Sequence, residues 1–195
     1  MITLRLASII LMVGLAILSC QTHHDHPHPH GHDHQHHENK QPTIDFDARL
    51  DSLGITLNTP GSPVANYVNI RQAGNILYLA GKGPSLPEGG YITGQIGNDL
   101  TVEEGYEAAK WAAIAQLSVL KDHLGDLNRV KQLLKVTGMV NAIPGFGDQP
   151  EVINGFSDTM VAVFGERGKH ARAAVGMGSL PRNIAVEVDL IVEIY

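Results

Sequence analysis

The chain has 195 residues, of which 43% are hydrophobic and 17% are charged, and its formal net charge is −6. This composition is ordinary for a soluble globular domain, and the acidic balance argues against nucleic acid as a main partner. Cys20 is the only cysteine, which excludes a disulfide within the chain.

Residues 1–20 have the pattern of a secretory signal peptide. Arg5 supplies a positive start, and residues 6–18 form an apolar run too short to span a bilayer comfortably. The run ends in Ser19 and Cys20, which resembles a bacterial lipobox, so we expect a lipoprotein signal peptide with lipidation at Cys20. The alternative is an ordinary cleaved signal. Because Gln21 replaces the Asp that often retains lipoproteins in the inner membrane, we expect lipid anchoring in the bacterial cell envelope, at the outer membrane facing the periplasm.

Residues 21–44 form a low-complexity linker with almost nothing apolar to bury, and we expect this linker to be disordered. Neutral imidazoles at this density coordinate Zn, Ni or Cu, so weak, multivalent metal binding is expected in the tail. The alternative is a solvated spacer without a metal function. The candidate ligands are His23, His24, His26, His28, His30, His32, His34, His36 and His37.

Residues 45–195 are long enough for one domain that buries around 70% of its unfolded surface, and no cofactor is expected for it. Helices end or begin where glycines and capping residues stand, and alternating apolar runs indicate strands. The expected elements are a short helix in 45–57, a hairpin of 67–73 and 76–80, a helix from Thr101 to Gly125, a strand over 133–140, and a helix from Asp148 to Gly165.

Residues 170–195 read as two strands joined by a tight connection at Leu180 and Pro181. The second strand alternates, so one face is core and the face that carries Glu187 meets a site, a subunit or water. We expect this connection to bring the strands of Arg172 and Glu187 together. The complete order predicts an α+β fold, in which two helices cover one face of a mainly antiparallel or mixed sheet.

Several residues stand at the spacing of a known family. Tyr67 lies seven residues before Gly74 and Asn75, Gly81 ends the following strand, and Asn154 sits in the second long helix. Towards the C-terminus, a second set of residues carries the same family pattern.

Arg172 precedes Leu180 and Pro181 by eight residues, and Glu187 follows Leu180 by seven. With this combination, residues 63–195 resemble the RidA/YjgF family of reactive-intermediate deaminases, also known as L-PSP endoribonucleases. Together with the expected lipoprotein signal, the chain resembles a divergent, exported member of that family. The resemblance implies a chorismate-mutase-like fold in a barrel-like homotrimer with sites between subunits. It also implies hydrolysis of enamines or imines such as 2-aminoacrylate to a 2-oxo acid and ammonia.

The resemblance implies catalytic roles for Arg172, Glu187 and Tyr67, and substrate binding by Arg172, Asn154 and Gly81. An arginine fork binds a planar carboxylate through two parallel hydrogen bonds. A carboxylate such as Glu187 can position or deprotonate the attacking water, and Tyr67 would add an apolar wall and a hydroxyl.

Two other functions stay open. The trimer could bind a small carboxylate without turnover, on a membrane tether whose histidines bind metal. A ribonuclease ranks third, because an acidic chain without a histidine pair or a basic stripe is poorly equipped for RNA. The expected partners are therefore a small carboxylate-bearing substrate, further copies of the chain, and the membrane through a lipid on Cys20.

Overall fold

The computed structural model describes residues 43–63 and 65–195. These residues belong to one unit, Lys40–Tyr195. The predicted signal peptide, Cys20 and the nine histidines of the linker lie outside the described residues. Within the described ranges, the structure contains no helix with the length and apolar character needed to cross a bilayer.

A five-stranded mixed sheet forms one layer of the domain, in the strand order β1-β2-β5-β3-β4. β3 and β4 are parallel, and the other neighbouring pairs are antiparallel. This confirms the predicted α+β class. The strands are β1 (Ile70–Ala73), β2 (Ile76–Lys82), β3 (Val130–Asn141), β4 (Ala171–Met177) and β5 (Val186–Ile194); the helices are α1 (Phe46–Ser52), α2 (Val102–Leu124) and α3 (Gln149–Phe164).

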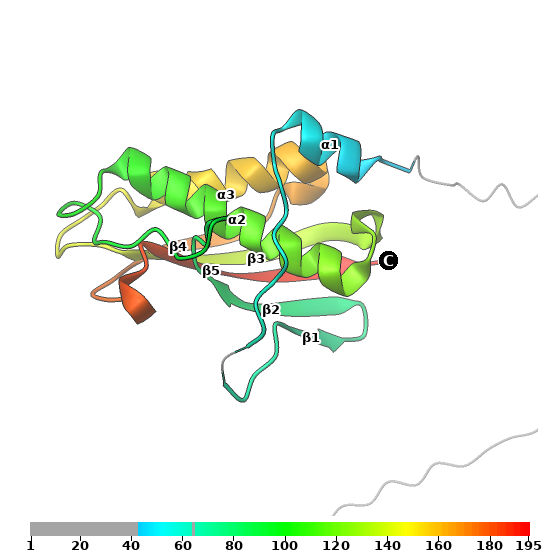
Figure 1. The fold of residues 1–195 in the computed structure, drawn as a ribbon, viewed down its shortest axis with the longest axis horizontal. Helices are drawn as coiled ribbons and strands as arrows, with labels where there is room; N and C mark the ends of the chain where they lie inside the picture. Colours follow the sequence, from blue (N-terminus) through cyan, green and yellow to red (C-terminus); the bar gives the residue numbers. More distant parts are fainter. Residues whose placement is uncertain (1–42, 64) are drawn as a thin grey trace, which may run out of the picture. The chain divides into compact units, whose positions relative to one another are not determined.

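The helices α2 and α3 cover one face of the sheet (Figure 1). α2 begins at a capping box, in which Thr101 Oγ1 accepts from the Glu104 backbone N–H and Glu104 Oε2 accepts from that of Thr101. These bonds satisfy two donors that a helix start leaves free. α2 ends at Gly125 and α3 at Gly165, both with a positive φ, as the sequence predicts.

The hydrophobic core lies between the sheet and these two helices. Every second residue of β5, from Val186 to Ile194, is buried, which confirms the predicted alternation. α2 and α3 also pack closely on each other, and Gly155 of α3 allows the contact: a Cβ there would overlap the carbonyl of Tyr106, 2.9 Å from its carbon.

The predicted C-terminal hairpin is wrong, because β3 separates β4 from β5. The chain leaves β3, crosses through α3 and returns as the parallel strand β4, as a crossover connection requires. Val136 of β3 is in register with Arg172 on one side and Leu190 on the other. Neighbours in register share a face, so Arg172 lies on the helix-covered face. Glu187, three positions from Leu190, lies on the opposite face.

We predict that Gly155→Ala lowers the free energy of unfolding by about 1–3 kcal/mol, the usual cost of overpacking. In an unobstructed helix interior the same change would stabilise by about 1 kcal/mol, so the sign tests the close approach of the two helices. Denaturant unfolding measures this difference. Gly147→Ala is the control, since nothing lies within 4 Å of a Cβ at that position; equal stability of the two variants would contradict the packing.

Candidate functional site

A cavity of about 720 Å³ opens where β2 ends. Its walls come from residues 58–62, the loop 83–91, one side of α2, the turn at 181–184 and β5. Three of the predicted site residues, Tyr67, Gly81 and Glu187, line this cavity. The fold therefore brings Glu187 to Tyr67 and Gly81, although Glu187 is far from both in the sequence.

A bulge in β2 shapes this end of the sheet. Leu79 pairs with Leu190 and Lys82 with Val188, so β2 carries one more residue than β5 over the same stretch. The side chain of Gln116, buried on α2, donates to the carbonyls of Ala80 at 3.0 Å and Val188 at 2.7 Å. Gln116 thus satisfies acceptors at the point where the ladder is irregular and ties α2 to the cavity.

Two glycines let the walls of the cavity approach each other. A Cβ at Gly81 would overlap the carboxylate of Glu187, 2.9 Å from its Cδ, and one at Gly83 would lie 2.8 Å from Ile184 Cδ1. Gly81 therefore accommodates the Glu187 side chain, which places this predicted binding residue beside the predicted catalytic carboxylate.

Glu187 and Lys82 are both half-buried and influence each other electrostatically. Burial raises the pKa of Glu187, the charge of Asp189 raises it further, and Lys82 lowers it. Burial lowers the pKa of Lys82, and Glu187 raises it. Lys82 Nζ donates to Asn69 Oδ1 at 2.6 Å. Burial thus shifts both pKa values towards the neutral form, and perturbed groups that share a cavity mark it as a candidate functional site.

The turn that carries Arg182 into the cavity wall has an unusual backbone. Arg182 and Asn183 both have φ of 57°, a left-handed conformation that asparagine tolerates but that costs energy for arginine. Buried Asn141 holds this turn, because its Nδ2 donates to Asn183 Oδ1 at 3.0 Å and to the Ile184 carbonyl at 3.3 Å.

Arg172 does not line the cavity. Its Nη1 donates to Asn154 Oδ1 at 2.9 Å and to Ser157 Oγ at 3.0 Å, and its Nη2 to the Pro150 carbonyl at 3.4 Å, all on α3. The structure therefore brings Arg172 together with Asn154, and places Glu187 on the other face of the same sheet.

His170 supports this arginine. Its Nδ1 lies 2.7 Å from the Gly168 carbonyl and its Nε2 lies 3.1 Å from Ser157 Oγ. Burial lowers the pKa of His170, which favours the neutral ring. A neutral ring protonated at Nδ1 donates to Gly168 and accepts from Ser157, and this leaves a Ser157 lone pair for Arg172.

Sequence reasoning missed two residues that line the cavity, Lys82 and Arg182, and one that supports its wall, Gln116. A lysine between two glycines and an arginine directly after Leu180 and Pro181 were the available signals. Gln116 interrupts the buried alanine-rich side of α2. Among the residues that the structure describes, no group of three or more His, Cys, Asp or Glu side chains could hold a metal.

The family model described as "YjgF/chorismate_mutase-like, putative endoribonuclease" matches residues 47–194. The chain therefore belongs to this YjgF family, which confirms the resemblance stated for the sequence. The five-stranded sheet and its helices match the YjgF/chorismate-mutase-like fold.

Three similar proteins can be aligned with this chain over nearly the whole of their own length. Protein TCP17 of Trypanosoma cruzi is 45% identical over 148 residues, which are 75% of this chain and 92% of that protein. The crystal structure of Atu1372 from Agrobacterium tumefaciens, of unknown function, has 42% identity and a TM-score of 0.72, over 77% of this chain and 92% of the other. A "putative endoribonuclease" from Shewanella oneidensis MR-1 has 31% identity and a TM-score of 0.73, over 76% and 99%.

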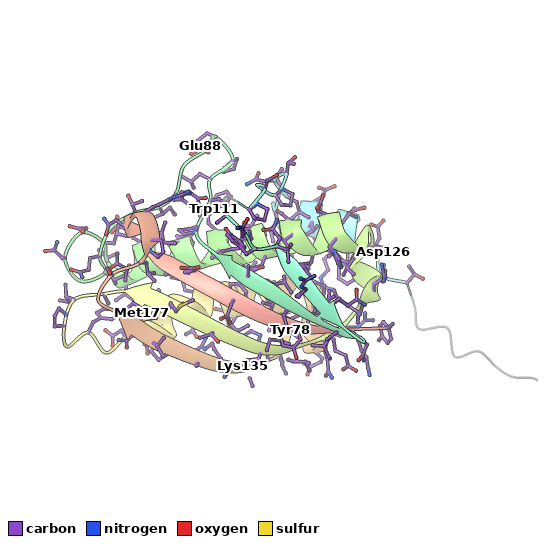
Figure 2. The ribbon with its side chains drawn as sticks, turned by 90° about the horizontal axis from the view of Figure 1, so that it is seen from below. Tyr78, Glu88, Trp111, Asp126, Lys135 and Met177 are labelled. Carbon is purple, nitrogen blue, oxygen red and sulfur yellow. The ribbon has the colours of Figure 1, made fainter. Side chains whose placement is uncertain are left out.

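We predict that the free energy of unfolding of Glu187→Gln, measured relative to that of the wild type, increases as pH rises. The folded carboxyl holds its proton to a higher pH than the unfolded one, which titrates near 4.3, so the wild type loses stability as pH rises through this window. The uncharged amide lacks that loss. Unfolding free energies at about pH 4 and pH 7 measure the effect, with the exposed Glu88→Gln as control (Figure 2). An unchanged difference between wild type and Glu187→Gln at the two pH values would contradict it.

Proposed function

We propose that this domain hydrolyses small enamine or imine intermediates, of the 2-aminoacrylate type, to a 2-oxo acid and ammonia. The observation that carries the proposal is Glu187, a half-buried carboxylate with a raised pKa in the wall of a cavity. A general acid–base group works best when its pKa is close to the working pH. The chain belongs to the YjgF family, and the resemblance to its RidA members implies this reaction class.

The proposed reaction needs one group that accepts a proton and later returns it. Glu187 takes a proton from water while the water oxygen bonds to the carbon of the protonated imine, which gives a neutral carbinolamine. The protonated Glu187 then gives its proton to the amine nitrogen. As the carbon–nitrogen bond breaks, Glu187 takes the hydroxyl proton, so that the carbonyl of the 2-oxo acid forms, and the departing ammonia carries this proton away as ammonium. Tyr67, which also lines the cavity, would contact the substrate with its ring or hydroxyl.

Arg172 is the proposed partner of the substrate carboxylate, and its position argues for a site shared between subunits. Within one chain, Arg172 and Glu187 lie on opposite faces of the sheet. The two residues can therefore act on one substrate only if Arg172 of one subunit meets Glu187 of a neighbour across an interface. Asn154, which holds the Arg172 guanidinium at 2.9 Å, is then a positioning residue for the carboxylate.

The sheet face opposite the helices supports assembly with further copies of the chain. Tyr78 and Val175 are exposed large hydrophobic residues, and their register with Ile191 and Met139 places them on this face. Figure 2 views the sheet from this side, with Tyr78 labelled. A barrel-like homotrimer would bury this face. Lipid anchoring through Cys20 at the cell envelope and metal binding by the histidine tail stay part of the proposal.

We predict that Arg172→Ala reduces kcat/KM for freshly generated 2-imino acids roughly 30-fold to several-thousand-fold. Truncating one partner of a buried charge pair usually costs about 2–5 kcal/mol. The release of 2-oxo acid is followed against the buffer rate, with Lys169→Ala as the control for a nearby exposed cation. Equal rates for wild type, Arg172→Ala and buffer would refute catalysis; carboxylate binding without turnover would then favour the non-catalytic carboxylate-binding trimer.

We also predict that inactive Arg172→Ala and inactive Glu187→Gln subunits regain activity when they are dissociated and reassembled together. In a random mixture, about a quarter of shared sites would combine an intact Arg172 with an intact Glu187. Activity of the mixture, compared with each variant treated identically, measures this. No recovery in mixed oligomers of the same size would place both residues in one subunit's site, or Arg172 outside it.

A further inference from the structure

Two cations of the cavity have no role in the reaction proposed above. Lys82 and Arg182 line the cavity together with Glu187, which is the only acidic residue among the lining residues. The cavity therefore carries an excess of positive charge, in a chain whose formal net charge is −6. A concave site of opposite sign to its protein attracts anions.

Both cations have donors available for a ligand. A lysine ammonium has three donors, and Lys82 Nζ donates to Asn69 Oδ1. Asn69 also donates to the Gly61 carbonyl at 3.2 Å and accepts from the Ala80 N–H at 3.0 Å. Lys82 is thus held in place by Asn69, which links Gly61 of the cavity wall to Ala80 of β2. No hydrogen bond or ion pair of Arg182 with another described residue is found.

The backbone at Arg182 supports a ligand-binding role. Its φ of 57° is unfavourable for arginine, and glycine would adopt this conformation at lower cost. Backbone strain of this kind gathers at ligand sites and persists where the surrounding structure enforces it. Asn141 holds this turn through its hydrogen bond to Asn183, so Arg182 is fixed at the cavity wall.

The cavity is also larger than a three-carbon imino acid needs. At about 30 Å³ for each liquid water, 720 Å³ corresponds to about two dozen water molecules, whereas such an acid has roughly six non-hydrogen atoms. The extra space lies in a cavity whose wall includes Lys82 and Arg182.

We propose that Lys82 and Arg182 bind a second acidic group of the substrate, so that the preferred substrate is the imine or enamine of a small dicarboxylic acid. This inference rests on the proposed function, in which Arg172 of a neighbouring subunit binds the first carboxylate. Three cations and the Glu187 carboxylate together leave two positive charges, which a dianion balances. The partial burial of Lys82 strengthens its attraction for a carboxylate compared with a fully solvated cation.

The test measures binding and not turnover, using 2-oxoglutarate and 2-oxopentanoate as probes that differ in the terminal carboxylate. Calorimetry on the full-length wild type is expected to give roughly tenfold tighter binding of 2-oxoglutarate, the usual scale for a hydrogen bond to a charged group. Lys82→Met and Arg182→Gly are expected to lose this preference. Arg182→Lys, which keeps the charge, and Lys110→Met, on the exposed side of α2, are expected to retain it.

Thermal unfolding distinguishes loss of the binding group from loss of the fold. Arg182→Gly relieves the positive φ, so its Tm is expected to equal or exceed that of the wild type while the preference disappears. Equal affinity of the wild type for the two acids, absence of binding of either acid, or a preference that survives both neutral variants would each overturn the inference. A preserved preference for the diacid without any imine hydrolysis would refute the proposed catalysis and leave the anion site standing.

Discussion

The extra residue in β2 determines where the groups of the cavity lie. By shifting the register between Leu79 and Lys82, it releases the Ala80 region from regular pairing, and Gln116 supplies the missing donors from α2. The bulge brings Gly81 against Glu187. Bulges redirect side chains at active sites in this way. In a regular strand Gly81 would pair with Val188 and Lys82 with Glu187, so the two charged residues would be direct cross-strand partners.

Lys82 and Glu187 are close enough for their charges to interact, but Lys82 donates its hydrogen bond to another residue. Lys82 donates to Asn69 rather than to Glu187, while its charge lowers the pKa that burial raises in the glutamate. A tight ion pair would satisfy both groups and leave little capacity for a ligand. The looser arrangement keeps Glu187 able to exchange a proton and Lys82 able to receive an anion.

The sequence predicted the helices well, because their limits are local. The capping box at Thr101 and the glycines that end α2 and α3 act within a few residues. Strand neighbours are not local, and this is why the hairpin prediction for residues 170–195 was wrong: alternation reveals the buried face of a strand but not the strand beside it. The positions of Lys82 and Arg182 depend on a bulge and on a left-handed turn, and no periodic pattern in the sequence predicts either feature.

The two faces of the sheet divide substrate recognition between subunits in the proposed assembly. One chain provides Glu187 with Lys82 and Arg182, and the neighbouring chain provides Arg172, already oriented by Asn154. A monomer could hold one acidic group of a ligand but could not fix its other end, so the imine carbon would not be placed against the attacking water. Because positioning accounts for a large part of catalytic rate, assembly and chemistry are coupled by the geometry of a single strand order.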